Sequence, residues 1–164
     1  RLLQEKGCHT ACVGKWHLGL TVAVRGKDDG KKVKLEGVPV GSITRDGPTT
    51  RGFDHFFGFH HARMMKSVFE NDRVTRLVEP VDMLPLLAER ASAYVAERAK
   101  TGKSFFLYLP LSSPHTPIVP SKEWKGRSGL GDYGDFVMET DWAVGEVLAA
   151  LAKAGVADDT LVVF

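Results

Sequence analysis

The hexapeptide Gly14-Lys15-Trp16-His17-Leu18-Gly19 brings an ammonium, an indole and an imidazole together between two glycines. It follows Ala11-Cys12-Val13, an apolar run typical of the end of a strand, and loops on rigid strand ends often carry catalytic groups. In an extended segment Lys15 and His17 face one side and Trp16 faces the other. A fixed positive charge beside a group that exchanges protons near neutral pH suits an anionic substrate whose reaction needs proton transfer. From these residues alone, a basic turn without chemistry is the alternative interpretation.

A second loop that could carry chemistry is Ser112-Ser113-Pro114-His115-Thr116-Pro117. It follows the run 105–109, which is apolar on both faces and therefore predicts a central parallel strand. The prolines restrict the backbone of this loop and would hold His115 in place. Because ligands of open α/β sheets bind beyond the carboxyl ends of the strands, the two loops would bring Lys15, His17 and His115 to one rim. A purely structural proline-rich loop is the alternative.

Two long helical patterns would cover this sheet. The first spans residues 82–101, with Asp82 as N-cap, Pro85 in the first turn and Gly102 beyond the end. Its predicted buried stripe consists of Leu84, Leu87, Ala88, Ala91, Tyr94 and Val95. The second helix spans 133–154 and precedes an apolar run at 161–164 that predicts a buried strand. Its predicted inward side chains are Val137, Val144, Leu148 and Leu151. This alternation of strands and helices predicts an α/β fold with helices flanking a mostly parallel sheet.

Smaller elements are predicted between the first strand and the first long helix. Residues 21–25 and 31–35 flank a glycine-bounded turn, as in an exposed hairpin, and residues 37–50 read as a loop. Residues 68–74 predict a second hairpin that turns at Asn71-Asp72.

The segment 51–61 is rich in aromatic side chains. Four phenylalanines lie within seven positions, 53–59, and most of them must be buried. His55, His60 and His61 would lie at the margin of that core. We expect histidines that are solvated or hydrogen-bonded within the fold, with substrate contact as the alternative.

Composition limits the classes of function. The chain of 164 residues is 43% hydrophobic and 26% charged, as expected for one globular domain with a core. A formal charge of +2 from 22 basic and 20 acidic residues argues against a broad nucleic-acid-binding or membrane-binding face, so anion recognition would be local. Cys8 and Cys12 are too few for a disulfide framework, and their C-x3-C spacing lacks the pattern of a zinc site. We expect two small buried thiols.

Asp141 interrupts the apolar stripe of the second helix, and a carboxylate there needs a partner. A structural ion pair or hydrogen bond is expected, with an active-site role as the alternative. The chain opens on what reads as the end of a helix and stops within the strand pattern at 161–164. We therefore expect an internal piece of a longer protein.

Four stretches in this order resemble the motifs of the sulfatase family, within the alkaline-phosphatase-like superfamily. The stretch Gly7-Cys8-His9-Thr10-Ala11-Cys12-Val13-Gly14-Lys15-Trp16-His17-Leu18-Gly19 is similar to the second sulfatase signature. The other three are Arg51-Gly52-Phe53-Asp54 with Phe57-Gly58, residues 105–109 leading to Ser113-Pro114-His115-Thr116-Pro117, and Gly131-Asp132-Tyr133-Gly134-Asp135 with Asp141 and Val144-Gly145. The resemblance covers nearly the whole chain.

The resemblance implies an arylsulfatase-like hydrolase of sulfate esters that uses a formylglycine nucleophile and calcium. Lys15 would bind the sulfate and neutralise its charge, which makes it both a catalytic and a substrate-binding residue. His17 would be the general base, and His115 would contact the ester oxygen. Trp16 would be a packing residue. The substrate implied is a sulfated small molecule or a sulfated carbohydrate, and no nucleic acid.

The chain departs from the family pattern in its nucleophile. Neither Cys8 nor Cys12 lies in a C-x-P/A-x-R motif, from which formylglycine is made. The calcium ligands of the family are expected before Arg1 and after Phe164, so this chain is expected to hold none of them. Residues 1–164 would thus be a partial catalytic domain, inactive when isolated.

Two other readings stay open. One is a phosphodiesterase or phosphonate hydrolase of the same superfamily, and the other is a non-catalytic pseudo-sulfatase that binds sulfated glycans. His60, His61 and Arg63 are the positions proposed for a sugar-binding subsite. The family suggests an extracytoplasmic, periplasmic or secreted protein, although the segment that would decide the compartment is not in this sequence.

Overall fold

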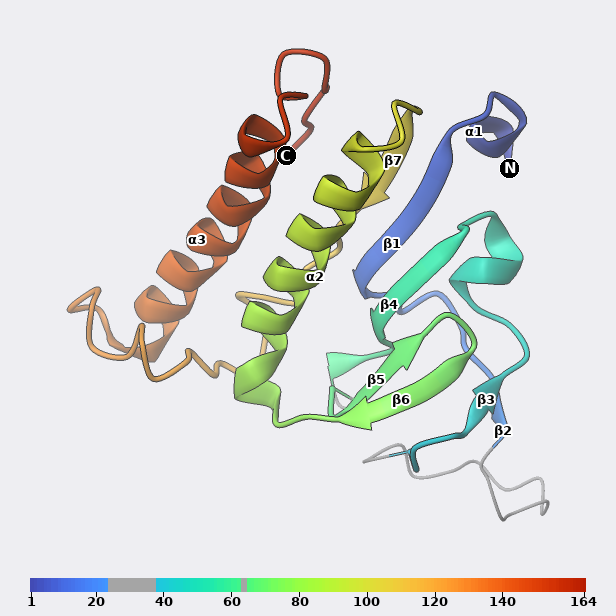
Figure 1. The fold of residues 1–164 in the computed structure, drawn as a ribbon. Coiled ribbons are helices and arrows are strands. Elements are labelled where there is room, and N and C mark those ends of the chain that lie inside the picture. The colour runs from blue at the N-terminus through green and yellow to red at the C-terminus, as the bar shows by residue number, and fades with distance from the viewer. Residues whose placement is uncertain (24–37, 63–64) are drawn as a thin grey trace.

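This computed structural model describes residues 1–23, 38–62 and 65–164, and its strands lie mainly in the first half of the chain with the two long helices after them (Figure 1). The helices and strands are α1 (Leu2–Glu5), β1 (His9–Lys15), β2 (Val22–Ala23), β3 (Ile43–Thr44), η1 (Pro48–Arg51), β4 (His55–Phe59), β5 (Ser67–Glu70), β6 (Arg73–Leu77), η3 (Pro80–Asp82), α2 (Met83–Ala99), β7 (Phe105–Tyr108) and α3 (Gly131–Lys153).

The strands within the described residues form one sheet in the order β2-β3-β6-β5-β4-β1-β7. β1 pairs in parallel with β4 on one side and with β7 on the other. The remaining neighbours pair antiparallel. The predicted α/β fold class is confirmed. The sheet is mixed, and its parallel part consists of the three strands from which the predicted site residues extend.

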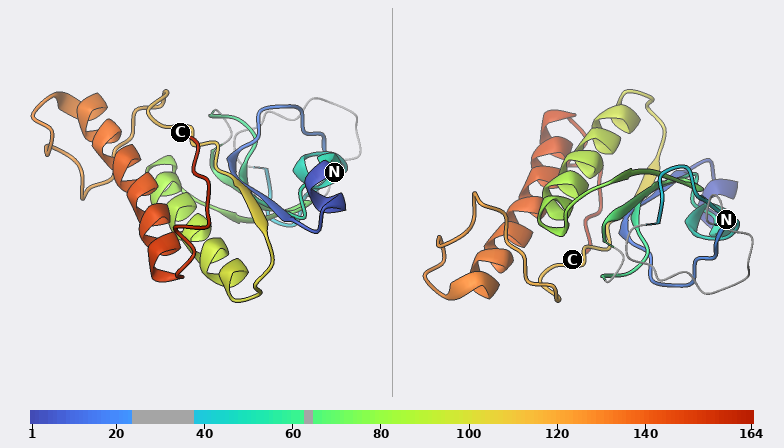
Figure 2. Two further views of the ribbon diagram at one scale, coloured as in Figure 1. Left: turned by 90° about the horizontal axis from the view of Figure 1, so that it is seen from above. Right: turned by 90° about the horizontal axis from the view of Figure 1, so that it is seen from below.

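The two faces of the sheet carry separate clusters of apolar side chains. Alternation along β1 and β4 turns Val13 and Phe57 toward α2, where they pack with Met83 and Leu87. The neighbouring side chains, among them Phe56, enter a second cluster on the other face. Both long helices lie on the same side of the sheet, as the two views in Figure 2 show. Three of the four predicted phenylalanines, Phe56, Phe57 and Phe59, are completely buried.

Helix α2 confirms its predicted buried stripe. All six side chains named for that stripe are buried, together with Met83. Asp82 occupies the N-cap position without a side-chain capping bond, and Gly102 takes the left-handed conformation (φ 64°) just past the end. β7, predicted as a central strand, is a parallel strand that pairs with β1 alone within the described sheet, and its Phe106 is 41% exposed.

The predicted inward face of α3 is wrong for two of its four residues, and Val144 is only partly buried. Val137 and Leu148 are 41% and 44% exposed, whereas Leu151 is buried as predicted. The buried face contains Asp135, Phe136, Glu139, Ala143 and Leu151. The helix is rotated about its axis because Phe136 and Ala143 pack against Leu84 and Ala88 of α2. This rotation leaves Asp141 exposed, so the partner predicted for it is not required.

Two other carboxylates of α3, at Asp135 and Glu139, fasten the preceding loop to the helix. Asp135 accepts hydrogen bonds from the backbone N–H groups of Gly126 (2.6 Å) and Ser128 (2.8 Å). Glu139 Oε2 accepts one from the N–H of Ser121 (2.8 Å). These charge-assisted bonds explain why both acids are buried on a helix face that otherwise packs apolar groups.

Replacement of Asp135 by Asn is expected to lower the melting temperature of the full-length protein by several degrees at pH 7. Hydrogen bonds from Ser128 and Gly126 hold the pKa of the Asp135 carboxyl below its usual range. Its contribution to stability is therefore present above the ordinary pKa of about 3.9 and is lost as pH falls through the lower folded value.

Thermal unfolding at pH 7 and pH 3 checks this: the difference in melting temperature between wild type and Asp135→Asn should shrink at pH 3. The exposed Asp132→Asn is the control and should change little, and an Asp135→Asn variant as stable as wild type at pH 7 would contradict the assignment.

The smaller elements agree in part with their predictions. The second hairpin is confirmed, with β5 and β6 joined through Asn71 at φ 55°. β2 pairs with β3, which lies within the predicted loop 37–50. The rest of the first predicted hairpin lies in residues 24–37, outside the described residues.

The strand predicted at 161–164 is not found. These residues are paired with none of the described strands, and Phe164 is fully exposed. Apolar, β-branched composition favours a strand only where a neighbour accepts its backbone hydrogen bonds. No helix in the described parts of the chain is long and apolar enough to cross a membrane.

Candidate active site

The carboxyl ends of β1, β4 and β7 lie at one edge of the sheet because the three strands run parallel (Figure 1). The segment after β1 carries His17, and the segment after β4 carries His60 and His61. The loop after β7 leads to His115. Three neighbouring strands thus deliver ionisable side chains to the edge where α/β proteins bind their ligands.

Backbone hydrogen bonds tie the end of β1 to the segments on both sides. The N–H of Lys15 donates to the carbonyl of Pro110 (2.8 Å), at the start of the loop after β7. The N–H groups of Trp16 and His17 donate to the carbonyls of Phe59 (2.9 Å) and His60 (2.8 Å). The parallel pairing of β1 with β4 therefore continues beyond the strands and fixes the backbone of this segment.

Gly14 and Gly58 allow the strands to approach this closely. They face each other in the register of β1 and β4, with φ angles of 140° and 152° that side chains rarely adopt. A Cβ on Gly58 would lie 2.0 Å from the carbonyl oxygen of Gly14. A Cβ on Gly14 would lie 2.4 Å from the carbonyl oxygen of Pro110. The glycine before Lys15 is thus required by close packing of three backbone segments.

Lys15 is the last residue of β1 and is partly buried, opposite Phe59 in the register. Among the described residues its ammonium forms no ion pair; the pairs found join Lys66 to Glu79, Arg90 to Glu70 and Lys125 to Asp132. An uncompensated ammonium at the carboxyl edge of a sheet is suited to bind an anionic group.

Trp16 and His17 diverge where the strand ends. Trp16 is 7% exposed, donates from Nε1 to the carbonyl of Gly19 (2.8 Å) and packs edge-on against Phe53, in keeping with the packing role that the resemblance implies. His17 takes a left-handed conformation (φ 51°), so the extended geometry assumed for the pair of Lys15 and His17 ends at Lys15. A non-glycine residue held in this region at a ligand-binding edge is a feature of functional sites.

The imidazole of His17 lies against two further histidines. Its ring centroid is 4.3 Å from that of His61 and 6.3 Å from that of His60, both in edge-to-face orientation. Nδ1 of His60 is buried and has no hydrogen-bond partner within the described structure. Burial, followed by the charges of His17 and His61, lowers the pKa of His60. Sequence reasoning expected His60 and His61 to be solvated or structurally bonded, and named them for a sugar subsite together with Arg63, which lies outside the described residues. Both histidines directly follow a strand that pairs with β1, and this is the signal of their closeness to His17.

His115 is exposed in the loop after β7. Its Nδ1 lies 2.7 Å from the carbonyl oxygen of Thr116, an acceptor, so Nδ1 carries a proton and Nε2 is left for other partners. The side-chain hydrogen bonds found for His115 join it to Thr116 and not to Lys15 or His17 within the described residues. Lys15 and His17 thus lie at the carboxyl end of β1 and His115 in the loop that follows β7, with no hydrogen bond between their side chains among the described residues.

The sequence pattern of one family accounts for the whole chain: the model of the Sulfatase family matches residues 1–164. The chain belongs to the sulfatase family. Among curated relatives, the N-acetylgalactosamine-6-O-sulfatase of Bacteroides thetaiotaomicron is 23% identical over 99% of this chain and 40% of its own length. The human N-acetylgalactosamine-6-sulfatase is 29% identical over 99% of this chain and 30% of its own.

A solved structure of a 6S-sulfatase, reported with glycosaminoglycan metabolism by Bacteroides thetaiotaomicron, shares the fold. It superposes with a TM-score of 0.79 at 22% identity, covering 97% of this chain and 42% of its own. This sulfatase chain therefore spans less than half the length of these three proteins.

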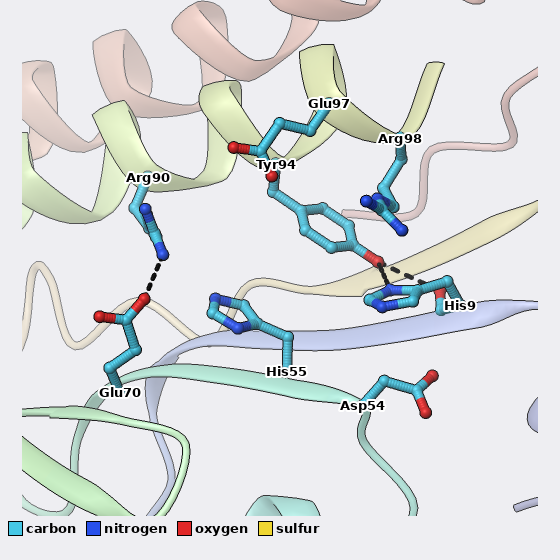
Figure 3. A pocket seen from close by; sticks show the side chains of 8 residues that line it. All are labelled: His9, Asp54, His55, Glu70, Arg90, Tyr94, Glu97 and Arg98. Atoms are coloured by element: carbon cyan, nitrogen blue, oxygen red, sulfur yellow. Dashed lines mark hydrogen bonds and ion pairs between the residues drawn. The ribbon is translucent and has the colours of Figure 1, made fainter. Parts of the chain in front are cut away.

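The polar cavity of about 280 Å³ in Figure 3 lies at the opposite end of the parallel strands of this sulfatase chain. It opens beneath α2 near His9 and His55, the first residues of β1 and β4. Many of its groups already have partners: Tyr94 Oη donates to the carbonyl of His9 (3.1 Å) and lies 2.9 Å from His9 Nδ1, and Arg90 pairs with Glu70. The cavity lies at the amino ends of β1 and β4, whereas Lys15 is the last residue of β1, so the cavity is separate from the candidate active site.

Membership of the sulfatase family implies a metal cofactor for the complete enzyme. Within residues 1–23, 38–62 and 65–164, no group of three or more His, Cys, Asp and Glu side chains could hold a metal ion. The carboxyl edge offers an ammonium and imidazoles, whereas calcium prefers oxygen ligands. These residues therefore do not fit a calcium site. Cys8 and Cys12 are free thiols, and burial raises the pKa of Cys12 to about 12, which makes it a poor nucleophile.

Proposed function

We propose that residues 1–164 are part of the catalytic domain of a sulfatase that hydrolyses a sulfate ester to an alcohol and sulfate. The observation that carries this proposal is that Lys15, whose ammonium forms no ion pair among the described residues, lies two positions before His17 at the carboxyl edge of a chain whose whole length matches the sulfatase family. An anion-binding cation next to a proton-transfer group is what ester hydrolysis of a sulfate requires.

Lys15 would hold the non-bridging oxygens of the sulfate and stabilise the charge that grows on them. His17, fixed through its backbone bond to His60, would accept a proton as the general base. Nδ1 of His115 donates to the carbonyl of Thr116, which leaves Nε2 to face the substrate. When Nε2 also carries a proton, it would donate that proton to the ester oxygen as the alcohol leaves. The resemblance adds a formylglycine nucleophile and calcium, but the described residues fit neither, and no step is assigned to them.

The proposed substrate is a sulfated carbohydrate. The two curated relatives are named for the 6-sulfate of N-acetylgalactosamine, a sulfated amino sugar. All of these relatives are sulfatases by name, which favours sulfate esters over the phosphodiester and phosphonate alternatives.

The test uses the full-length protein and measures release of inorganic sulfate from p-nitrophenyl sulfate and from N-acetylgalactosamine 6-sulfate. Release is expected from at least one ester; a chelator should abolish it and added Ca²⁺ should restore it. Bis-p-nitrophenyl phosphate is the control substrate, and faster turnover of that diester would favour the phosphodiesterase alternative. Binding of the sugar sulfate without hydrolysis would instead favour a pseudo-sulfatase. No sulfate from any ester would overturn the proposal.

A further inference from the structure

We infer that His60 and His61 form a subsite that binds a hydroxyl or amide group of the sugar whose sulfate Lys15 holds. This inference rests on the proposed function and deepens it, because it assigns substrate selection to two histidines outside the three residues of the predicted chemistry.

The position of these histidines is fixed by the sheet. His60 follows the last residue of β4, and its carbonyl accepts the backbone N–H of His17 (2.8 Å). Lys15 is opposite Phe59, one residue earlier in the same register. His60 and His61 therefore directly follow the residue that is paired with Lys15, which makes them neighbours of Lys15 across the two strands.

The unpaired Nδ1 of His60 points to a ligand. Buried polar atoms nearly always have a hydrogen-bond partner, and an atom that lacks one marks a place for a water molecule or a ligand group. The carbonyl of His60 accepts the N–H of His17, but its Nδ1 has no hydrogen bond within the part of the chain that the structure describes. At a carboxyl edge already suited to an anion, a substrate group is the natural partner.

The charges around His60 favour a neutral ligand group. Among the described residues, His17, His61 and Asp46 are the ionisable groups that act on it. Asp46 is engaged by Thr21, whose backbone N–H and hydroxyl both donate to its carboxylate, so it is occupied by other donors. Burial, followed by the charges of His17 and His61, lowers the pKa of His60 and so favours its neutral form. A neutral imidazole offers one donor and one acceptor, which match a hydroxyl or an acetamido group better than a second anion.

The inference is tested with full-length enzyme on two substrates that share the sulfate ester. N-acetylgalactosamine 6-sulfate presents hydroxyls and an amide, whereas p-nitrophenyl sulfate presents neither. For His60→Ala we expect kcat/KM for the sugar sulfate to fall about 10- to 100-fold, mainly through KM, as for the loss of one or two hydrogen bonds. Activity on p-nitrophenyl sulfate, which offers the subsite no hydroxyl or amide, should fall less, so the ratio of kcat/KM for the two substrates should change about 10-fold or more. His61→Ala should show the same direction.

Two further variants separate binding from structure. His60→Asn retains an amide nitrogen near the position of Nδ1 and should recover part of the lost KM for the sugar sulfate. His55→Asn changes a histidine of the same strand at its opposite end, and should leave the ratio of the two substrates unchanged. If His60→Ala does not fold, His60→Asn and wild-type kinetics on deoxygenated sugar sulfates give the answer, since removal of the bound hydroxyl or amide should raise KM.

Equal losses on both substrates would overturn the inference, because they would show that His60 and His61 act through His17 or through the fold. Unchanged kinetics on both would also overturn it. If the wild-type enzyme releases no sulfate from either ester, the proposed function fails separately. The subsite is then judged by calorimetric binding of N-acetylgalactosamine 6-sulfate, which His60→Ala must weaken for the inference to stand.

Discussion

Replacement of His17 by Asn in the full-length protein is expected to lower kcat for sulfate esters by about 10²- to 10⁴-fold, the usual contribution of a general base. KM should change little, because the ammonium of Lys15 and the neighbouring histidines are retained. Asn is the appropriate replacement because His17 has a φ of 51°, and Asn tolerates this left-handed conformation better than Ala does. The decrease in kcat would then result from the missing imidazole and not from a distorted loop.

Steady-state kinetics on p-nitrophenyl sulfate, together with thermal unfolding, measure this result. His55→Asn is the matched control, since His55 lies at the other end of the neighbouring strand against Tyr94, and its kcat should equal that of wild type. A folded His17→Asn enzyme with wild-type kcat would remove His17 from the chemistry and leave the proton transfer to another group at this edge, such as His115.

Replacement of Gly58 by Ala is expected to destabilise the protein by more than about 3 kcal/mol, the upper part of the range for overpacked sites. The added Cβ would lie 2.0 Å from the carbonyl oxygen of Gly14, and backbone atoms cannot move aside as a flexible side chain can. The φ of 152° adds strain for any residue with a Cβ. Displacement of β1 from β4 would also move Lys15 and His17, so residual folded protein should be nearly inactive.

Urea or thermal unfolding of the full-length protein measures the loss, and soluble yield reports the most severe outcome. Gly145→Ala is the control: Gly145 lies within α3, and a Cβ there meets nothing within 4 Å. Alanine in a helix interior should stabilise it by up to about 1 kcal/mol. A Gly58→Ala protein as stable as Gly145→Ala would mean that β1 and β4 are farther apart at the site than described here.

Local patterns were sufficient for several features of this chain. The buried stripe of α2, the position of Gly102 past its end, the burial of most phenylalanines in 53–59 and the turn at Asn71 were all predicted correctly. Each of these depends on a short window of sequence, where side-chain periodicity or a single backbone requirement decides the result. The ordered motifs likewise indicated the sulfatase family, which the match over residues 1–164 shows.

Tertiary structure alone decided the features that depend on neighbours. α3 carries apolar residues on more than one side, and contact of Phe136 and Ala143 with α2 selected the face that buries Asp135 and Glu139 and exposes Asp141. The strand pattern at 161–164 has no partner among the described strands and stays exposed.

The candidate site shows the same division. The sequence singled out Lys15, His17 and His115 by residue type and spacing. Only the parallel pairing of β1 with β4 placed His60 and His61 against the ring of His17, and only the close approach of Gly14, Gly58 and Pro110 fixed that edge. Spacing along a chain describes local geometry, whereas contacts between residues more than 40 positions apart depend on which strands pair and in what register.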